Sequence, residues 1–543
     1  MFDISEIDFE LLKKRGPNSF QIKCIDLNDK YVCYLAASVL SLRGINVCKQ
    51  PITDEIYRNY LLWNGEIFSS DLVNVNSNEN DGLKLYECLS KCQNEDDIFE
   101  IISSIKGPYA FLYFDFNRKI IYFGRDRIGR RSLLINEIIT ENSTIFMLSS
   151  VRVFQTNSQK QYEFNELKAN GIYKIDLNSR SFKIDFIEWR TSVNSQSSIN
   201  HKLIDNISLF NDSLVPIQRS KEDIEEIKEN FLKFLKQSVM RRVTPLPNLC
   251  KKCFSNDINK FNEDNTKCEH SKVAILFSGG IDSAVIAALA DQCLPEDESI
   301  DLLNIAFEQS SKINGENNYL VPDRVSGKEC LKELNSKRKW NFVEINVTYD
   351  ELKESRAKLI KNLIYPLDTV LDDSIGCAIW FASKGSGYLN NELYQSNAEV
   401  LLLGMGADEQ LAGYARHRTR YRHEGWLGLV LELKMEMKRI SERNLGRDDR
   451  ILSDHGKESR LPFLDEDFID YVNKLQIFDK VDFNLPKGLG EKYLLRCCAS
   501  EKLGLHFASK LPKRAIQFGS RVAKLENSKE KASDKCQRLA DDE

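Results

Sequence analysis

Residues 273–290 read VAILFSGGIDSAVIAALA, and this stretch decides the fold. An apolar run, Val273–Phe277, is followed by a Ser-Gly-Gly turn and then by a segment rich in Ala, Ile and Leu. This pattern predicts a buried β-strand, a tight turn and an α-helix. Glycines let backbone N–H groups approach an anion closely, and a helix N-terminus adds its positive dipole end. The stretch therefore predicts a site for phosphate groups.

Within this loop, one carboxylate and several small residues suggest how phosphates would be held. Asp282 would repel a bare phosphate, so its presence suggests a bridging Mg²⁺. Neither GxxxxGK[ST] nor GxGxxG is present, and a glycine-rich turn without a ligand stays open as the alternative. The residues predicted here to hold phosphate groups are Ser278, Gly279, Gly280, Asp282 and Ser283.

A second apolar run ends in a similar turn at residues 400–414, VLLLGMGADEQLAGY. Gly404 and Gly406 are predicted to extend this phosphate site, because both turns would open at the carboxyl edge of one parallel sheet. Asp282 and Asp408 could then share one Mg²⁺, which prefers oxygen ligands.

Composition narrows the class of protein. The chain has 543 residues, of which 42% are hydrophobic, and this is enough for about two to four domains. A net charge of −5 gives no basic field for nucleic acid. We expect no membrane span and no signal peptide. The 14 cysteines are scattered, which favours a reducing, cytoplasmic setting.

The pattern of short apolar runs changes along the chain. Residues 20–185 alternate in a way that predicts an antiparallel, sheet-dominated domain. From Val273 onward strands alternate with helical segments, which predicts a doubly wound parallel sheet. A helix should begin near Ser220, with Asp223 completing a capping box. The predicted boundaries are a domain over 1–190, a linker over 191–219, a domain over 220–525 and a loose polar tail over 526–543.

Five motifs in the second half resemble the synthetase domain of glutamine-dependent asparagine synthetases. They are SGGIDS, LGMGADEQLAGY, ESRLPFLD (458–465), Gly490-Glu491-Lys492 and Leu511–Arg514. The first half resembles a class II glutamine amidotransferase. The residues that carry this likeness are Arg15-Gly16-Pro17, Leu40–Arg43, Trp63–Phe68, Asp81, Phe123–Asp126 and Gly129–Arg131. The amino-acid sequences of these motifs most resemble those of a divergent branch, the asparagine synthetase domain-containing proteins.

This resemblance implies an αββα amidotransferase-like domain and an ATP pyrophosphatase domain. It implies ATP and Mg²⁺ as cofactors. The residues that it implies to bind ATP and pyrophosphate are Ser278, Gly279, Gly280, Asp282, Ser283, Gly404 and Gly406. It also implies aspartate with glutamine or ammonia as substrates, without nucleic acid or membrane; a homodimer stays open. Aspartate would be activated as β-aspartyl-AMP. Lys492 would offset negative charge during adenylation.

The same resemblance implies a glutamine site in the first half. Asn64 and Gly65 would form an oxyanion hole. The residues implied to bind glutamine are Arg43, Asn64, Glu66 and Asp81, and of these Arg43 and Asp81 would hold its carboxylate and amine.

The chain departs from the family at the glutaminase nucleophile. In the family this is a Cys exposed by removal of Met1, whose α-amino group serves as the base. Here Phe2 follows Met1, and Cys24 lies after Arg15-Gly16-Pro17 instead of before it. We expect no glutaminase activity from the chain as written. A truncated translation of an intact site and a protein that has lost its glutaminase both stay open.

A second departure is Met405, where typical asparagine synthetases place a Glu thought to position or deprotonate the amine. A thioether cannot accept a proton. Glu409, Asp372 and Asp373 are candidate replacements. Two alternatives to asparagine synthesis therefore stay open, which are an inactive scaffold of the same fold and an ATP pyrophosphatase ligase acting on another acid.

Three further groups of residues could bind a metal ion, a nucleic acid or phosphate. Cys250-x₂-Cys253 with Cys268-x-His270 could supply zinc ligands, or the cysteines could be ordinary thiols. The arginines at 443, 447 and 450 stand among aspartates, which favours an ion-pair network over a nucleic-acid patch. Lys513-Arg514 is expected to be a solvated basic pair.

Overall fold

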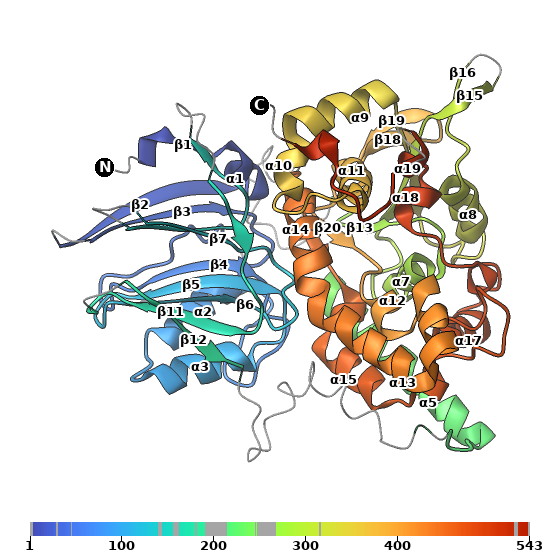
Figure 1. Ribbon diagram of the computed structural model, residues 1–543, viewed down its shortest axis with the longest axis horizontal. Helices are drawn as coiled ribbons and strands as arrows, with labels where there is room; N and C mark the ends of the chain where they lie inside the picture. The colour runs from blue at the N-terminus through green and yellow to red at the C-terminus, as the bar shows by residue number, and fades with distance from the viewer. Residues whose placement is uncertain are drawn as a thin grey trace. The chain divides into compact units, whose positions relative to one another are not determined.

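The computed structural model describes most of the chain and leaves several connections undescribed (Figure 1). The described residues are 4–28, 31–44, 46–139, 144–155, 162–179, 182–189, 214, 216–244, 246, 253, 268–313, 316–525 and 530–540. Most of the predicted linker lies outside them, so the boundaries at 190 and 220 stay predictions. Chain packing forms two units. Unit 1 holds 1–195, 362–367 and 440–457, and unit 2 holds the rest.

Unit 1 is built on antiparallel sheets, as the alternating runs predicted. The largest has the strand order β12-β11-β6-β5-β4, and every neighbouring pair in it is antiparallel. Its strands are β4 (Tyr60–Gly65), β5 (Tyr109–Asp115), β6 (Ile120–Arg125), β11 (Gly171–Asp176) and β12 (Ile184–Glu188). A second sheet has the order β10-β7-β8, with β7 (Leu134–Ile139), β8 (Thr144–Ser149) and β10 (Asn165–Glu166). Two further pairs are β2 (Ser19–Asn28) with β3 (Tyr31–Val39) and β1 (Ile7–Asp8) with β9 (Phe154–Gln155).

Alternation along β5 explains how these layers pack, because successive side chains of a strand point to opposite faces. Tyr109 and Phe111 join a buried cluster with helices α2 (Asp81–Leu89) and α3 (Glu95–Ser104). Ala110 faces the other way and packs with side chains of β7 and β8. The five-stranded sheet therefore lies between a helical layer and a second sheet, which confirms the antiparallel α+β class for this half.

Unit 2 contains the predicted parallel sheet, in the strand order β19-β18-β17-β14-β13-β20-β21. Five strands run parallel, namely β13 (Val273–Leu276), β14 (Ile300–Phe307), β17 (Trp340–Val347), β20 (Val400–Leu402) and β21 (Glu458–Arg460). The hairpin of β18 (Ser386–Leu389) and β19 (Glu392–Gln395) adds an antiparallel edge that sequence patterning did not predict. In the sheet β13, the first of these strands in the sequence, lies between β14, the second, and β20, the fourth. The strand order therefore reverses there, and such a switch point is where open α/β sheets bind ligands.

Helices flank the strands of unit 2. Helix α5 (Lys221–Val243) begins with the predicted capping box, in which Ser220 and Asp223 each accept the other's backbone N–H. The others are α7 (Ile281–Asp291), α8 (Pro322–Leu331), α9 (Tyr349–Ser355), α11 (Val370–Lys384), α12 (Ala407–Gln410), α13 (Ala415–Ile440), α15 (Glu466–Lys474), α16 (Ile477–Lys480), α17 (Tyr493–Lys502), α18 (Ile516–Gly519) and α19 (Val522–Leu525). Unit 1 also holds α1 (Glu10–Arg15), α14 (Gly446–Ser453) and all but the first residue of α10 (Lys361–Ile364). Of the helices described, none combines the length and apolar character needed to cross a membrane.

The described part of the polar tail is not loose. The backbone N–H groups of Val370 and Leu371, at the start of α11, donate to carbonyls of the tail at 2.9 and 3.0 Å. Cys536 is buried, and its N–H donates to the Asp368 carbonyl at 2.7 Å. The first N–H groups of a helix have no partner inside it. Residues 530–540 therefore dock because they satisfy the start of α11, which local composition could not reveal.

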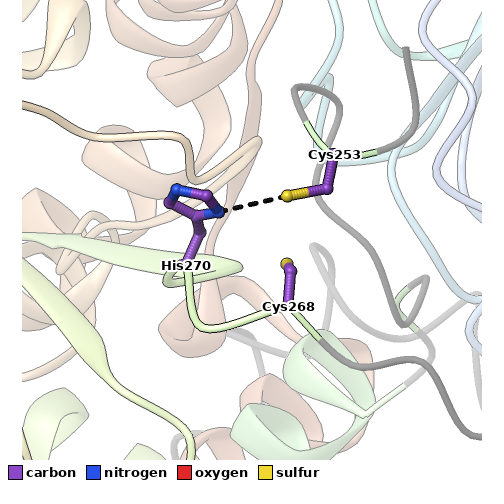
Figure 2. A group of neighbouring side chains, drawn as sticks. All are labelled: Cys253, Cys268 and His270. Carbon is purple, nitrogen blue, oxygen red and sulfur yellow. Dashed lines mark hydrogen bonds between the residues drawn. The ribbon is translucent and has the colours of Figure 1, made fainter. Parts of the chain in front are cut away.

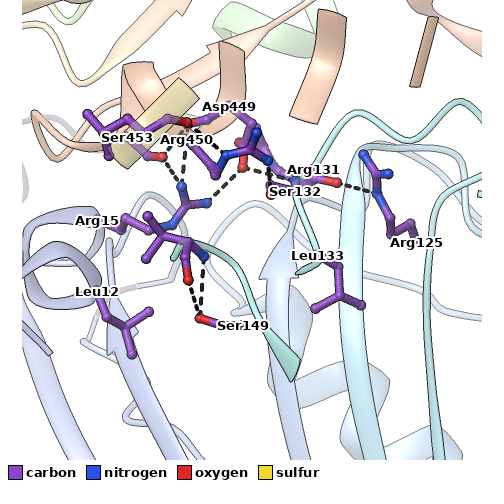
Figure 3. A network of polar contacts seen from close by, with 12 residues as sticks. Leu12, Arg15, Arg125, Arg131, Ser132, Leu133, Ser149, Asp449, Arg450 and Ser453 are labelled. Atoms are coloured by element: carbon purple, nitrogen blue, oxygen red, sulfur yellow. Dashed lines mark hydrogen bonds and ion pairs between the residues drawn. The ribbon is translucent and has the colours of Figure 1, made fainter. Parts of the chain in front are cut away.

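A buried ion network ties two distant segments of unit 1 together, as Figure 3 shows. The Asp449 carboxylate of α14 lies 2.7 Å from the Arg15 guanidinium and 3.3 Å from that of Arg131. Burial alone would raise the pKa of Asp449, but these two guanidinium groups outweigh it and lower the pKa. Arg450 pairs with Glu166 and donates to the Leu363 carbonyl. The predicted ion-pair network is confirmed, and its three ion-pair partners in the first half of the chain lie between 284 and 434 residues away in the sequence.

Replacing Asp449 should destabilise unit 1 strongly. Asp449→Asn removes the charge that two buried arginines share, and breaking a buried pair costs about 3–5 kcal/mol. Chemical denaturation should show the transition of this unit at lower denaturant. Glu10→Gln is the control, because its ion pair with Lys13 is exposed, and it should leave the midpoint unchanged. Equal midpoints for the wild type and Asp449→Asn would contradict this role.

Candidate functional site

The phosphate-loop prediction falls at the carboxyl end of β13. Ser278, Gly279 and Gly280 connect β13 to α7, and Ser283 donates from its hydroxyl to the Gly280 carbonyl at 3.0 Å. Gly279 has φ +75°, and a Cβ there would lie 2.4 Å from the backbone of Ser326. Only glycine suits that position. The loop is thus held against α8, and Ser326 donates to the Ser278 carbonyl at 2.8 Å.

The second glycine-rich turn meets this loop. Gly404 and Gly406 follow β20, which is the parallel neighbour of β13. A Cβ built on Gly404 would lie 2.7 Å from the Cβ of Asp282. The chain then enters α12, whose second residue is Asp408. The switch point of the sheet therefore brings both predicted turns together.

One lysine joins the two predicted Mg²⁺ ligands. The Nζ of Lys492 lies 2.7 Å from both carboxylate oxygens of Asp282 and 2.6 Å from Oδ1 of Asp408. Its side chain is 1% exposed. A Cβ on Gly413 would lie 1.9 Å from Asp408 Oδ1 and 2.3 Å from the Lys492 side chain, so glycine there makes room for the contact. Three segments more than 80 residues apart therefore converge on one ammonium group.

The segment before α17 holds Lys492 in place. Lys492 has φ +55°, and its backbone N–H donates to the Leu411 carbonyl at 3.0 Å. The preceding residue, Glu491, accepts from the Arg418 guanidinium at 2.6 Å and from the Gly488 N–H at 2.7 Å. The Gly-Glu-Lys motif is thus a rigid support for the lysine side chain.

A second lysine, which sequence analysis expected to be solvated, also contacts Asp408. Lys513 forms an ion pair with the Oδ2 of that carboxylate. Burial would raise the pKa of Asp408, but Lys492 and Lys513 together outweigh it and lower the pKa below its ordinary range. Burial would lower the pKa of Lys513, but Asp408 and Asp282 raise it instead. Lys513 and Arg514 are exposed, as predicted for the pair, but the ion pair of Lys513 with Asp408, 105 positions earlier, was not predicted.

The donor set fits a divalent cation. Oxygens of Asp282 and of Asp408 both lie within 2.7 Å of one point, the Lys492 Nζ. Carboxylate oxygens that converge in this way are the ligands that Mg²⁺ takes, usually together with substrate phosphates and water. The predicted assignment of Asp282 and Asp408 to Mg²⁺ is therefore compatible with their placement and stays a prediction.

The neighbourhood of Met405 contains one candidate replacement carboxylate. Met405 lies between the two glycines of the second turn. Glu409 is buried beside Asp408 and accepts from the Tyr414 hydroxyl at 2.6 Å. Burial and the charge of Asp408 raise the pKa of Glu409. A carboxylate with raised proton affinity adjoins the paired aspartates.

The other two candidates are engaged elsewhere. Asp372 accepts from the hydroxyl of Thr369, which caps α11, at 2.5 Å. Asp373 forms ion pairs with Arg356 at 2.8 Å and with Arg538 of the tail at 3.2 Å. These contacts stabilise the start of α11. Glu409 is consequently the best placed of the three.

In unit 1 the residues predicted to bind glutamine lie close together. Asn64 and Gly65 end β4 opposite Ala110 and Tyr109 of β5. Glu66 follows, and its carboxylate lies 2.8 Å from the Arg43 guanidinium.

The next peptide links the remaining members of this group. Arg43 also donates to the Ile67 carbonyl at 2.9 Å, and the Ile67 N–H donates to the Asp81 carboxylate at the same distance. The five residues thus surround one strand end, and their binding role stays a prediction.

Cys24 lies away from that strand end in the sheet topology. It is exposed on β2, opposite Tyr34 of β3, in a two-stranded sheet separate from the one that holds Asn64. This placement agrees with the interpretation that Cys24 is not a nucleophile for the glutamine site.

Comparison with known proteins decides the family. The family model described as asparagine synthase matches residues 268–432 and 421–539. Asparagine synthetase domain-containing protein 1 of Gallus gallus is 41% identical, over 97% of this chain and 95% of its own length. The protein of that name from Homo sapiens is 42% identical, over 99% of this chain and 95% of its own length. The chain belongs to the asparagine synthetase domain-containing protein 1 family.

For this member of the asparagine synthetase domain-containing protein 1 family, the match covers the residues that carry the site. Asp282, Asp408 and Lys492 all lie inside the asparagine synthase match. Among solved structures, the glutamine PRPP amidotransferase of B. subtilis aligns with 57% of this chain and 64% of its own at 12% identity, with a TM-score of 0.25. That score is too low to carry an argument. Family membership confirms the resemblance, and the reaction remains to be proposed.

A buried acid beside the phosphate loop was missed by sequence analysis. Asp323 is the second residue of α8, is 5% exposed and lies 3.9 Å from the Arg514 guanidinium. Burial raises the pKa of Asp323 from 3.8 to about 7, against the opposing pull of Arg514 and Lys513. No motif signalled this carboxyl, because its burial depends on the packing of α18 against α8.

The pH dependence of stability should reveal Asp323. The folded protein keeps this proton up to about pH 7, whereas an unfolded Asp loses it near 3.8, so stability falls as pH rises through that window. Asp323→Asn removes the cost. The free energy of unfolding of Asp323→Asn minus that of the wild type should therefore rise by on the order of 2–3 kcal/mol from pH 5 to pH 8. Asp350→Asn, at an exposed aspartate, is the control and should follow the pH dependence of the wild type. If the difference in unfolding free energy between Asp323→Asn and the wild type does not change with pH, the pKa of Asp323 is not raised.

Proposed function

We propose that this protein is an ATP-dependent ligase that forms asparagine from aspartate, with glutamine or ammonia as the nitrogen donor. The observation that carries this proposal is the contact of Lys492 with Asp282 and Asp408 at the switch point of the parallel sheet. Two carboxylates beside a glycine-rich loop suit a nucleotide with its metal. Two lysines at the same carboxylates suit a reaction in which negative charge grows.

The chemistry takes place in two steps. A carboxylate oxygen of aspartate attacks the α-phosphorus of ATP, and pyrophosphate leaves. Ammonia then attacks the acyl carbon of β-aspartyl-AMP, loses a proton, and AMP departs with the former carboxylate oxygen. The backbone of Ser278–Ser283 would hold the pyrophosphate. Lys492 would stabilise the charge that develops on the leaving group.

Mg²⁺ would be held by Asp282 and Asp408 and, when bound, would neutralise phosphate charge. Lys492 and Lys513 pair with these carboxylates in the structure and would no longer be needed there as counter-charges. Both lysines could then face phosphate oxygens. The two lysines offset the charge of the two aspartates, so the site needs no other counter-ion before the nucleotide arrives.

The nitrogen donor is assigned to unit 1. Asn64 and Gly65 are proposed to stabilise an oxyanion, and Arg43, Glu66 and Asp81 to bind glutamine. This assignment rests on the family resemblance and on the clustering of these residues at the end of β4. Free ammonia is the alternative donor, and the synthetase half can be tested with it directly.

A second candidate is ligation of a different carboxylic acid by the same route. Met405 favours it, because the thioether cannot pair with an amine as a carboxylate would. Glu409 favours aspartate, because it supplies a nearby acid with raised proton affinity. An inactive scaffold is the third outcome.

Pyrophosphate release tests the proposal. Purified protein with ATP, Mg²⁺, ammonia and aspartate should form pyrophosphate and AMP in equal amounts. Release only with another small acid would favour the second candidate. Calorimetry that detects no ATP binding by folded protein would refute an ATP-dependent function altogether.

Lys492→Ala should slow pyrophosphate release by roughly 10²–10³-fold, the loss typical of one preorganised donor. ATP affinity should change little, because the lysine interacts most strongly in the transition state. Lys510→Ala is the matched control, since Lys510 is an exposed lysine, and it should retain full activity. An unchanged rate in Lys492→Ala would remove this lysine from the reaction.

Asp282→Ala should weaken the Mg²⁺ dependence of ATP binding sharply, because it removes one of two proposed ligands. Calorimetric titration with ATP, with and without Mg²⁺, measures this dependence. Identical Mg²⁺ dependence in the wild type and Asp282→Ala would contradict the assignment.

A further inference from the structure

Three potential metal ligands meet just before the first strand of the parallel sheet. Figure 2 shows the side chains of Cys253, Cys268 and His270 close together. Their ligand atoms all lie within 4.8 Å of one another. The Cys253 Sγ lies 3.4 Å from the His270 Nδ1. Within the described part of the chain, no other group of three His, Cys, Asp or Glu side chains converges in this way. Cys250, the fourth residue of the predicted zinc set, lies outside the described residues. This cluster has no part in the proposed ligase chemistry.

The spacing matches that of zinc ligands. With Zn–S near 2.3 Å and Zn–N near 2.0 Å at a tetrahedral angle, a sulfur and a nitrogen ligand lie about 3.5 Å apart. The separation of Cys253 Sγ and His270 Nδ1 is 3.4 Å. Cys253 comes from a point 15 residues before Cys268, so this proximity is not imposed by neighbouring positions in the chain. The three side chains are only partly buried, which leaves an ion access to them.

We propose that Cys253, Cys268 and His270 bind one Zn²⁺ ion, with a fourth position open to water or another ligand. Binding releases the two thiol protons to solvent, and the neutral imidazole coordinates through Nδ1. Two thiolates and an imidazole form a donor set that selects Zn²⁺ over Mg²⁺. No oxidation or reduction is involved.

The position of the ligands suggests what the ion does. Cys268 and His270 precede β13 (Val273–Leu276) by a few residues, and β13 leads directly into the Ser278–Ser283 loop. A metal that joins Cys253 to this point closes a long loop of chain, which stabilises the folded state by limiting the unfolded one. Zinc would therefore stabilise the segment that leads into β13, and it would not contact the reacting atoms.

Metal content tests the proposal. The full chain, purified with a thiol-free reductant from medium containing zinc, should hold about one equivalent of zinc by elemental mass spectrometry. Cys253→Ser, Cys268→Ser and His270→Ala should each lose most of it. His270→Cys replaces one zinc ligand by another and should retain it. Cys293→Ser, a partly exposed thiol outside the cluster, should match the wild type.

Two measurements on the unaltered protein guard against variants that fail to fold. Cobalt(II) exchanged into the wild type should produce the visible bands and thiolate charge-transfer absorption of a tetrahedral sulfur site. Chelation should lower the melting temperature, and added zinc should restore it. The proposal would be overturned if the folded wild type contained no zinc and showed no thiolate charge-transfer absorption with cobalt(II). So would zinc retained in all three ligand variants, or a Cys253–Cys268 disulfide in the reduced preparation.

Discussion

The ion contacts among Lys492, Asp282 and Asp408 are the constraint on which unit 2 depends. Each residue comes from a different segment, and their charged groups meet only because β13 and β20 lie side by side in the sheet. Glycine at 413 leaves the space that the lysine side chain needs. Burying such a group is unfavourable unless every charge is paired. The fold and the candidate chemistry therefore depend on the same few contacts.

Unit 1 depends on a comparable contact. The Asp449 carboxylate pairs with Arg15 and Arg131, and α14 that carries it lies in the half of the sequence that otherwise builds unit 2. Residues 1–195 by themselves would lack the carboxylate with which Arg15 and Arg131 pair. The units defined by packing are consequently not two consecutive pieces of sequence. Asp449 explains in physical terms why residues 440–457 belong to unit 1.

Sequence patterns predicted the strands, turns and helix caps whose formation depends on residues close together in the chain. The apolar run before Ser278, the alternation along β5 and the capping box at Ser220 were all recoverable, because each depends on neighbours within a few residues. Contacts over long separations were not recoverable from composition. The ion pair of Lys513 with Asp408 was not predicted, and residues 530–540 resembled a loose tail, because both depend on partners far away in the sequence. The proximity of Asn64, Arg43 and Asp81 was expected from the family resemblance alone.

The central claim is that a carboxylate attacks the α-phosphorus of ATP at the site of Lys492, Asp282 and Asp408. Isotope transfer tests it most directly. Aspartate labelled with ¹⁸O in its side-chain carboxylate, incubated with the protein, ATP, Mg²⁺ and ammonia, should pass one labelled oxygen to AMP, as mass spectrometry of the AMP would show. AMP formed without label, or ADP and phosphate in place of AMP and pyrophosphate, would contradict the account.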